Sequence, residues 1–198
     1  ALRHLQTISL ASQERLALLV TVDMRCRLAI GFMRLTQHGT KPMNGPSIEV
    51  VATAAEAAEL DDLLWSVLWL PLDLPRTFRH ELSMDGEQLE TVAKVEGRIV
   101  GGLVAVWTAP GEVELRHLAV VPDAQGRGAG INLVADLLRR VTRKGYRRIR
   151  TIARSTSIGF FKNLGFRSVP GEAPEHTAFT RHGIRFAVME MIVDQGGA

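Results

Sequence analysis

The stretch LAVVPDAQGRGAGINLVADLLRR (Leu118–Arg140) decides the fold, because a glycine-rich turn within it joins an apolar extended run to an amphipathic helix. The turn is QGRGAG (Gln125–Gly130), and the helix that it opens runs from Gly130 to Lys144 with apolar residues at helical spacing. A helix N-terminus has unpaired N–H groups and a partial positive charge, and residues without side chains let an anion approach them. The sequence therefore predicts a phosphate site at this turn.

Two common phosphate-binding motifs do not fit its spacing. A dinucleotide-binding turn has the pattern G-x-G-x-x-G and an acid about 20 residues later. Here the glycines are spaced G-x-G-x-G, and Arg147, Arg148 and Arg150 stand where that acid is expected. A nucleoside-triphosphate loop needs a lysine after its last glycine, and Ile131 follows instead. Spacing excludes both motifs.

Extended and helical patterns alternate along the rest of the chain. Thr91–Gly97 and Arg98–Thr108 are extended runs that meet at an E-G-R turn, which predicts a hairpin. The whole pattern predicts an α/β fold with a mixed, mostly antiparallel central sheet flanked by helices. The other predicted strands are Ser47–Thr53, Glu112–Pro122, Arg147–Ala153 and Ile184–Val193, and the other helices are Ala54–Trp69 and Ser157–Gly165, with a loop at Leu70–Arg76.

This order of segments resembles the GNAT superfamily of N-acetyltransferases, in which a Q-x-x-G-x-G loop follows a strand and opens a helix. IEVVATAAEAAEL (Ile48–Leu60) resembles the family's first strand and helix, and EGRIVGG (Glu96–Gly102) resembles its hairpin. SIGFFKNLGF (Ser157–Phe166) is similar to its late helix. The resemblance covers Ser47 to Val193. It implies an acyl-CoA N-acyltransferase domain at residues 47–198, preceded by an N-terminal extension and linker at residues 1–46.

The resemblance also implies acetyl-CoA as the acyl donor and no metal. The N–H groups of the glycine turn would bind the pyrophosphate. The strand before the turn would splay from its neighbour, so that its backbone pairs with the pantetheine arm and polarises the thioester carbonyl. The implied cofactor-binding residues are Leu118, Ala119, Val120, Gln125, Gly126, Arg127, Gly128, Ala129, Gly130 and Phe161.

Two residues are candidates for the catalytic base, which is needed because an amine of pKa about 10.4 is protonated near neutrality. Glu114 is the first, since some family members carry a glutamate base at this strand position. His117 is the second, because a pKa of about 6.5 suits proton transfer at neutral pH. In an unbroken strand their side chains face opposite ways, and a bulge would change that parity. The alternative is that both belong to a polar strand edge.

The late helix departs from the family pattern at Phe161, where many members have a tyrosine proposed to protonate the departing thiolate. A thiol of pKa about 8.5 leaves as the thiolate at pH 7 at a cost of about 2 kcal/mol, so solvent can supply the proton later. Arg154 replaces an asparagine that is often present. Tyr146, the only tyrosine, lies at the start of another predicted strand.

Arginines crowd the segment from Arg139 to Arg154. This segment has three interpretations. The arginines belong to a solvated face, or one or two of them contact the 3′-phosphate of CoA together with Arg127. The third is nucleic-acid binding, which would need stacking aromatic residues nearby. The resemblance places the acceptor pocket between the segment before the hairpin and the loop before the last strand. Its apolar candidates are Trp65, Trp69, Leu70 and Phe78, and its polar candidates are Glu175, His176, Arg181 and His182.

The first 46 residues have a net charge of +4, with six basic against two acidic residues, whereas the remainder, with eighteen against nineteen, has a net charge of −1. Ser9–Leu35 predicts a long helix and His38–Pro46 a linker. This extension would pack on the domain, mediate a homodimer or be exchanged between chains; one alternative is that the natural chain begins at Met43.

The single cysteine, Cys26, excludes an internal disulfide and favours a reducing, cytoplasmic setting. Leu16–Val22 is the longest apolar stretch near the start, and it is far shorter than the roughly 20 residues that span a bilayer. We therefore expect no membrane partner.

The sequence thus predicts an acetyl-CoA-dependent N-acetyltransferase that acts by direct attack of a small-molecule or peptide amine. Two alternatives remain open. One is an acyl-CoA-binding sensor module without catalysis, and the other is an acetyltransferase acting on a nucleic-acid-bound amine.

Overall fold

A computed structural model describes residues 19–21, 45–81, 85–173 and 177–193, with only the backbone described for 19–21. Its centre is one sheet in the order β2-β3-β4-β5-β6-β8-β7, with β1 paired to β5 off this path. All neighbouring pairs are antiparallel except β5–β6 and β1–β5, which confirms the mixed, mostly antiparallel sheet. The strands are β1 Leu19–Thr21, β2 Ser47–Val50, β3 Glu87–Val95, β4 Arg98–Ala109, β5 Glu112–Val120, β6 Arg148–Arg154, β7 Arg167–Ser168 and β8 Phe186–Ile192.

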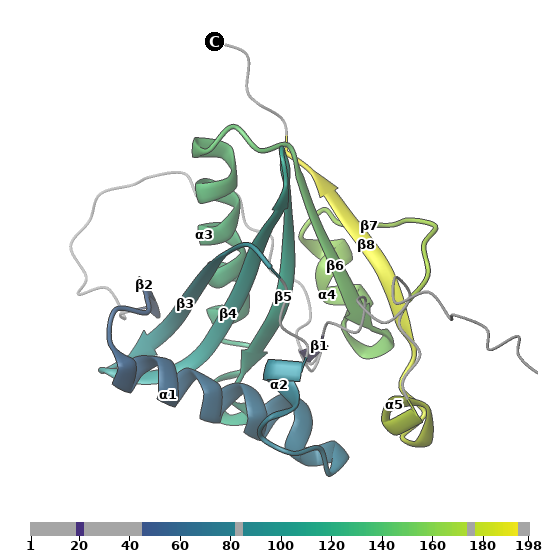
Figure 1. Ribbon diagram of the computed structural model, residues 1–198. Coiled ribbons are helices and arrows are strands. Elements are labelled where there is room, and N and C mark those ends of the chain that lie inside the picture. The colour runs from purple at the N-terminus through teal and green to yellow at the C-terminus, as the bar shows by residue number, and fades with distance from the viewer. Residues whose placement is uncertain (1–18, 22–44, 82–84, 174–176, 194–198) are drawn as a thin grey trace, which may run out of the picture.

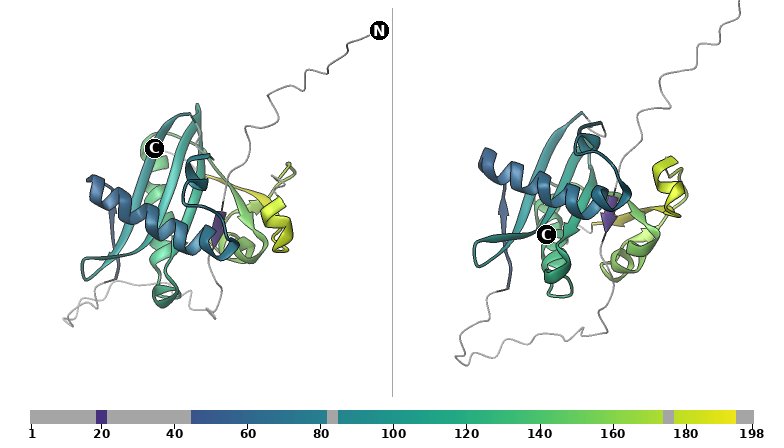
Figure 2. Two further views of the ribbon diagram at one scale, coloured as in Figure 1. Left: turned by 60° about the horizontal axis from the view of Figure 1, so that its bottom comes forward. Right: turned by 90° about the horizontal axis from the view of Figure 1, so that it is seen from below.

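Helices cover both faces of the sheet, as Figures 1 and 2 show. On one face lie α3 (Ala129–Arg143) and α4 (Ile158–Asn163), whose apolar side chains form one core cluster with inward-facing residues of β4, β5 and β6. On the other lie α1 (Ala54–Leu64) and α2 (Phe78–Glu81), with Phe179 of α5 (Thr177–Arg181) in the same second cluster. The predicted α/β architecture is therefore confirmed.

The helix predicted at residues 54–69 is present, with a change of geometry near its end. Thr53 caps α1 by accepting a hydrogen bond from the Glu56 backbone N–H at 3.1 Å, and the Glu56 carboxylate accepts one from the Ala52 backbone N–H at 2.9 Å. After Leu64 the chain continues as a π-helical turn, η2 (Trp65–Trp69), and then as a 3₁₀ turn, η3 (Leu70–Leu72). This succession turns the chain toward α2.

Strands β3 and β4 form the predicted hairpin. Glu96 and Gly97 have φ values of 50° and 80°, so both turn residues adopt the left-handed conformation that a two-residue hairpin requires. Further along β4, two adjacent glycines face opposite layers of the molecule. A Cβ on Gly102 would lie 2.1 Å from Cδ1 of Leu60 in α1, and a Cβ on Gly101 would lie 3.4 Å from Cδ1 of Leu133 in α3. Leucines from both helical layers thus approach β4 at this point.

The predicted long helix at Ser9–Leu35 is wrong for residues 19–21, which form strand β1 in parallel with β5. Backbone hydrogen bonds to β5 replace helical ones here. The other residues of that stretch, and the predicted linker up to residue 44, lie outside the described residues.

Candidate active site

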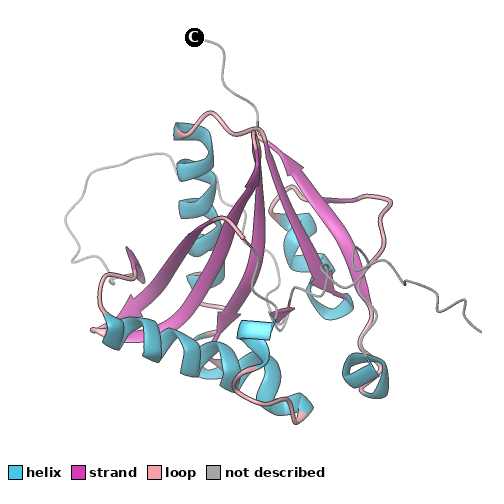
Figure 3. Ribbon diagram, viewed as in Figure 1, coloured by secondary structure: helices cyan, strands magenta, loops and turns pink. Residues whose placement is uncertain are grey.

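Strands β5 and β6 begin together and then diverge, as Figure 3 shows. They pair in parallel only over Glu112–Leu115 and Arg148–Thr151, although β5 continues to Val120 and β6 to Arg154. At the last paired position the Thr151 hydroxyl donates a hydrogen bond to the Leu115 carbonyl at 3.0 Å. Beyond it, the β5 backbone from His117 to Ala119 pairs with β1. The divergence leaves this edge of β5 unpaired with β6, and β1 takes the place of β6 at these three positions.

A bulge in β5 interrupts the strand just at this divergence. Leu115 pairs with Ala105 and His117 with Val104, which are adjacent on β4, so Arg116 is the additional residue of the bulge. Leu115 and Leu118 accordingly belong to the core cluster on the α3 side, while His117 contacts Trp69 on the α1 side. The bulge therefore turns the side chains of Glu114 and His117 to the same face of the sheet.

Glu114 is held by the bulged residue. Arg116 Nη1 donates a hydrogen bond to Glu114 Oε1 at 3.1 Å, and the Arg116 side chain is buried while that of Glu114 keeps 20% of its surface exposed. Burial lowers the pKa of Arg116, and the Glu114 carboxylate opposes that shift. Glu114 is thus an oriented carboxylate that retains access to solvent.

His117 has a different environment. It is 3% exposed and meets Trp69 edge-on, with ring centroids 5.1 Å apart. Burial lowers its pKa well below the usual 6.5, and the cations Arg116 and Arg79 lower it further. The imidazole is therefore neutral at pH 7, and its Nδ1 has no hydrogen-bond partner in the described part of the chain.

The predicted phosphate loop has the expected backbone form. Gly126 and Gly128 have φ values of 73° and 86°, and no atom lies within 4 Å of a Cβ built at either position. Gly128 precedes α3 without any side-chain capping bond, which leaves the N–H groups of the first helical turn available. Gln125 fixes the loop to the strand by donating a hydrogen bond from Nε2 to the Val120 carbonyl at 3.0 Å.

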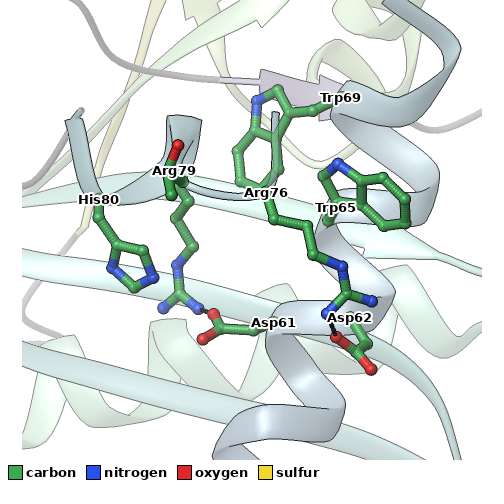
Figure 4. Close-up of a pocket in the computed structure, with 8 residues that line it drawn as sticks. Asp61, Asp62, Trp65, Trp69, Arg76, Arg79 and His80 are labelled. Carbon is green, nitrogen blue, oxygen red and sulfur yellow. Dashed lines mark hydrogen bonds and ion pairs between the residues drawn. The ribbon is translucent and has the colours of Figure 1, made fainter. Parts of the chain in front are cut away.

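A cavity of about 160 Å³ lies on the α1 side between α1, η2 and α2 (Figure 4). Arg79 pairs with Asp61 and with Glu90 of β3, and Arg76 pairs with Asp62 while its guanidinium lies 4.7 Å from the Trp65 ring centroid. The lining residues are Asp61, Asp62, Trp65, Trp69, Arg76, Thr77, Arg79 and His80. Because Trp69 also contacts His117, the cavity adjoins the bulged part of β5.

The comparisons with known proteins agree with this geometry. Residues 70–193 match the family model of the acetyltransferase (GNAT) domain. This protein belongs to the GNAT acetyltransferase family.

Solved structures of the same fold resemble the GNAT protein at low identity. An aminoglycoside 6'-N-acetyltransferase complexed with coenzyme A is 17% identical with a TM-score of 0.62, and the match covers 77% of this chain and 99% of that one. The ribosomal-protein-S18-alanine N-acetyltransferase of Escherichia coli is 17% identical with a TM-score of 0.57, covering 77% and 96%. Tetrahymena GCN5 is 19% identical with a TM-score of 0.57, covering 76% and 98%.

The late helix of this GNAT protein carries Phe161 inside the core. The ring has no exposed surface and packs against Phe160 and Phe166 with centroid distances of 5.2 and 5.1 Å. Tyr146 instead packs on Trp107, with centroids 4.9 Å apart. Phe161 has no hydroxyl, and Tyr146 lies outside α4. The role of Phe161 in cofactor binding stays a prediction.

Several arginines in and after α3 make ion pairs with neighbouring acids. Arg139 and Arg140 contact Asp136 at 3.0 and 2.6 Å, and Arg148 and Arg150 contact Glu112 at 3.3 and 3.6 Å. Arg154 is different: it is buried, and its Nη2 donates a hydrogen bond to the Leu68 carbonyl at 2.6 Å. Burial lowers the pKa of Arg154 to about 10.

The acceptor predictions divide into two groups. Trp65 and Trp69 line the cavity, Phe78 is buried beside Trp69, and Leu70 is exposed and does not line it. Arg181 and His182 lie at the end of α5, and Glu175 and His176 lie outside the described residues. Sequence reasoning missed Asp61, Asp62, Arg76, Arg79 and His80, although the pairing of D-D on a helix with R-x-x-R-H just after a proline-rich turn was a visible signal.

Two further properties concern the described residues alone. They contain no group of three or more His, Cys, Asp or Glu side chains placed to hold a metal ion. None of their helices has the length and apolar character that crossing a membrane requires.

Proposed function

We propose that this protein transfers an acetyl group from acetyl-CoA to a primary amine by direct attack on the thioester. One observation carries the proposal: a single strand, β5, has the bulge with Glu114 and His117 near its middle and is separated from the uncapped glycine loop only by a 3₁₀ turn at Pro122–Ala124. A donor lying along the edge of β5 that faces away from β4 would place its pyrophosphate at the loop and its thioester at the bulge.

The cofactor half of the proposed site consists mainly of backbone. N–H groups of Gly126 to Gly130 would bind the pyrophosphate, and the edge of Leu118, Ala119 and Val120 that faces away from β4 would pair with the pantetheine amides. Arg127 is exposed beside the loop and has the charge to meet the 3′-phosphate. The coenzyme A bound to the similar aminoglycoside 6'-N-acetyltransferase supports this assignment.

Glu114 is the proposed general base. Its carboxylate is partly exposed and is oriented by Arg116, so it can take a proton from the incoming ammonium directly or through water. His117 is the rival base. Since burial lowers the pKa of His117, it binds a proton more weakly than a free imidazole does. We therefore assign His117 to packing against Trp69 at the boundary of the acceptor cavity.

The amine acceptor would enter from the cavity beside α1. Trp69 joins the cavity to His117, and Glu114 lies on the same face of β5. The two cavity carboxylates, Asp61 and Asp62, are both paired with arginines, so the cavity combines both signs of charge with aromatic surface.

A ligand panel tests the donor assignment. Acetyl-CoA, NAD and ATP are added separately to the whole chain and the thermal midpoint is measured, because a ligand that binds only the folded state stabilises it. The expected result is a rise in midpoint with acetyl-CoA alone, followed by amine-dependent release of free thiol in an acceptor screen. No shift with acetyl-CoA would overturn the proposal.

Phe161 favours one second candidate, a module that binds acyl-CoA without turnover. A buried phenylalanine cannot protonate the thiolate, and binding needs no proton donor. The acceptor screen separates the two functions: a midpoint rise without thiol release from any amine would support the module, and thiol release would exclude it.

A further inference from the structure

Strand β1 lies in the place that the proposed function gives to the pantetheine arm. Leu19 pairs with His117, Val20 with Leu118 and Thr21 with Ala119, all in parallel. These β5 positions lie just past the point where pairing with β6 ends. Figure 2 shows the short purple strand next to the end of the α1 segment. The chain itself therefore fills the divergence between β5 and β6.

One strand edge offers a single set of N–H and C=O groups. On its other edge β5 is already paired with β4 from Glu112 to Val120. A pantetheine arm pairing with Leu118 and Ala119 would need the same backbone groups that β1 uses. The two occupants therefore exclude each other.

The fit of β1 in this place is incomplete. Besides β5, it contacts β6, η2 and the 3₁₀ turn η5 (Ser155–Ser157). Three buried polar atoms on or beside these elements have no hydrogen-bond partner in the described structure: Trp69 Nε1, His117 Nδ1 and Arg154 Nε. Buried polar groups are normally paired, so a polar ligand can satisfy groups that β1 leaves unsatisfied.

We propose that Leu19–Thr21 is an internal competitor of acyl-CoA, which occupies the free edge of β5 in the empty protein and leaves it when the donor binds. This inference rests on the proposed function. The affinity for acetyl-CoA then depends on the fraction of molecules in which β1 has left the edge of β5, because a ligand that binds only one state has its affinity reduced by the fraction of molecules in that state.

Hydrogen exchange on the whole, unaltered chain gives the first test. Without ligand, the amides of residues 19–21 and 117–119 are protected together. With saturating acetyl-CoA, the amides of 19–21 lose protection, while 117–119 stay protected and 126–130 gain protection. Unchanged protection of 19–21 in the presence of bound acetyl-CoA overturns the inference and leaves the proposed function intact.

A paired substitution gives the second test. Val20→Pro with Thr21→Pro removes the backbone N–H groups of two of the three β1 residues, and Val20→Ile with Thr21→Val is the matched control that keeps them. By calorimetry the proline variant is expected to bind acetyl-CoA about threefold tighter or more. A threefold change is expected if β1 occupies the edge of β5 in about two-thirds of the original molecules, because only the remaining third can bind the donor. The control is expected to bind like the original chain.

The outcomes separate the two proposals. Equal acetyl-CoA affinity in the original, control and proline chains overturns the internal competitor alone. Absence of acetyl-CoA binding to all three, with folded thermal transitions, overturns the proposed function and this inference together.

Discussion

The two sides of β5 are built in contrasting ways. The glycine loop is a run of consecutive residues whose N–H groups are available because glycines and an uncapped helix leave them so. The cavity beside α1 is made of side chains from separate segments, and its ion pairs include Arg79 with Glu90 of β3. In the proposed function, the cofactor is therefore held mainly by local backbone, whereas the acceptor meets side chains that the fold brings together from separate segments.

The largest expected effect concerns the reaction rate, which depends on the side chain of the proposed base, Glu114. Glu114→Gln is expected to lower kcat about 1000-fold through loss of the base, with the acetyl-CoA Kd unchanged, measured by thiol release and calorimetry. Glu112→Gln is the control, because its carboxylate has similar exposure, 22% against 20%, and is also paired with an arginine. Turnover of Glu114→Gln at the original rate would exclude Glu114 and make His117→Gln the next variant.

On the cofactor side the expected loss is in binding rather than in chemistry. Gly128→Glu forces a non-glycine residue into φ 86° and puts a carboxylate at the proposed pyrophosphate site. We expect the acetyl-CoA Kd to rise about 100-fold, a change of about 2.7 kcal/mol. Gly145→Glu, at φ 73° near the other end of α3, carries the same backbone strain away from the loop. Equal affinities of the two variants would break the comparison.

His117 lies between the glycine loop and the cavity beside α1, and its burial is expected to make stability depend on pH. Its pKa is lowered in the folded protein, so below about pH 6.5 the unfolded chain binds a proton that the folded chain does not. The free energy of unfolding therefore falls with decreasing pH, by up to about 1.4 kcal/mol per pH unit from this group. In His117→Leu this part of the acid sensitivity is expected to disappear in urea titrations between pH 6.5 and 4.5.

His182→Leu is the control for that measurement, because His182 is exposed at the end of α5. It is expected to leave the pH dependence of the original chain unchanged. If His117→Leu keeps the full acid sensitivity, the buried imidazole is not its source.

The smallest effect is expected at the outer rim of the cavity. Arg76 and Asp62 are more than half exposed, so Arg76→Gln is expected to change the free energy of unfolding by less than about 0.5 kcal/mol. Arg79→Gln is the contrasting variant, since its guanidinium is 12% exposed and faces two acids, and about 3 kcal/mol is expected there. Urea denaturation measures the free energy of unfolding of both variants. Equal losses in the two variants would show that burial does not distinguish the ion pairs of Arg76 and Arg79.

The sequence predicted features whose causes are local. The glycines of the phosphate loop and of the Glu96–Gly97 turn need positive φ, and such residues are recognisable one by one. The alternation of strands and helices likewise predicted the sheet and its flanking layers. The structure shifted most boundaries by only a few residues, as with the predicted helix Gly130–Lys144, which is α3 at Ala129–Arg143.

Features that depend on distant partners were not predictable. The bulge at Arg116 follows from the register with β4, and the sequence left open which way Glu114 and His117 face. The ion pairs of Arg79 and the bond from Arg154 to Leu68 join segments far apart in the chain. Strand β1 was predicted as helix because its pairing with β5 is not encoded by local periodicity.

The adjacent glycines of β4, Gly101 and Gly102, determine how closely the helices pack on the sheet, and this limits how the protein can be redesigned. Leu60 of α1 occupies the space of the Cβ that Gly102 lacks, so Gly102→Ala would force the buried Leu60 side chain to move. Four residues of the cavity wall, from Asp61 to Trp69, follow Leu60 directly on α1 and η2. A directed-evolution library that varies residues 60 and 102 would therefore reshape the cavity from behind, without altering any side chain that lines it.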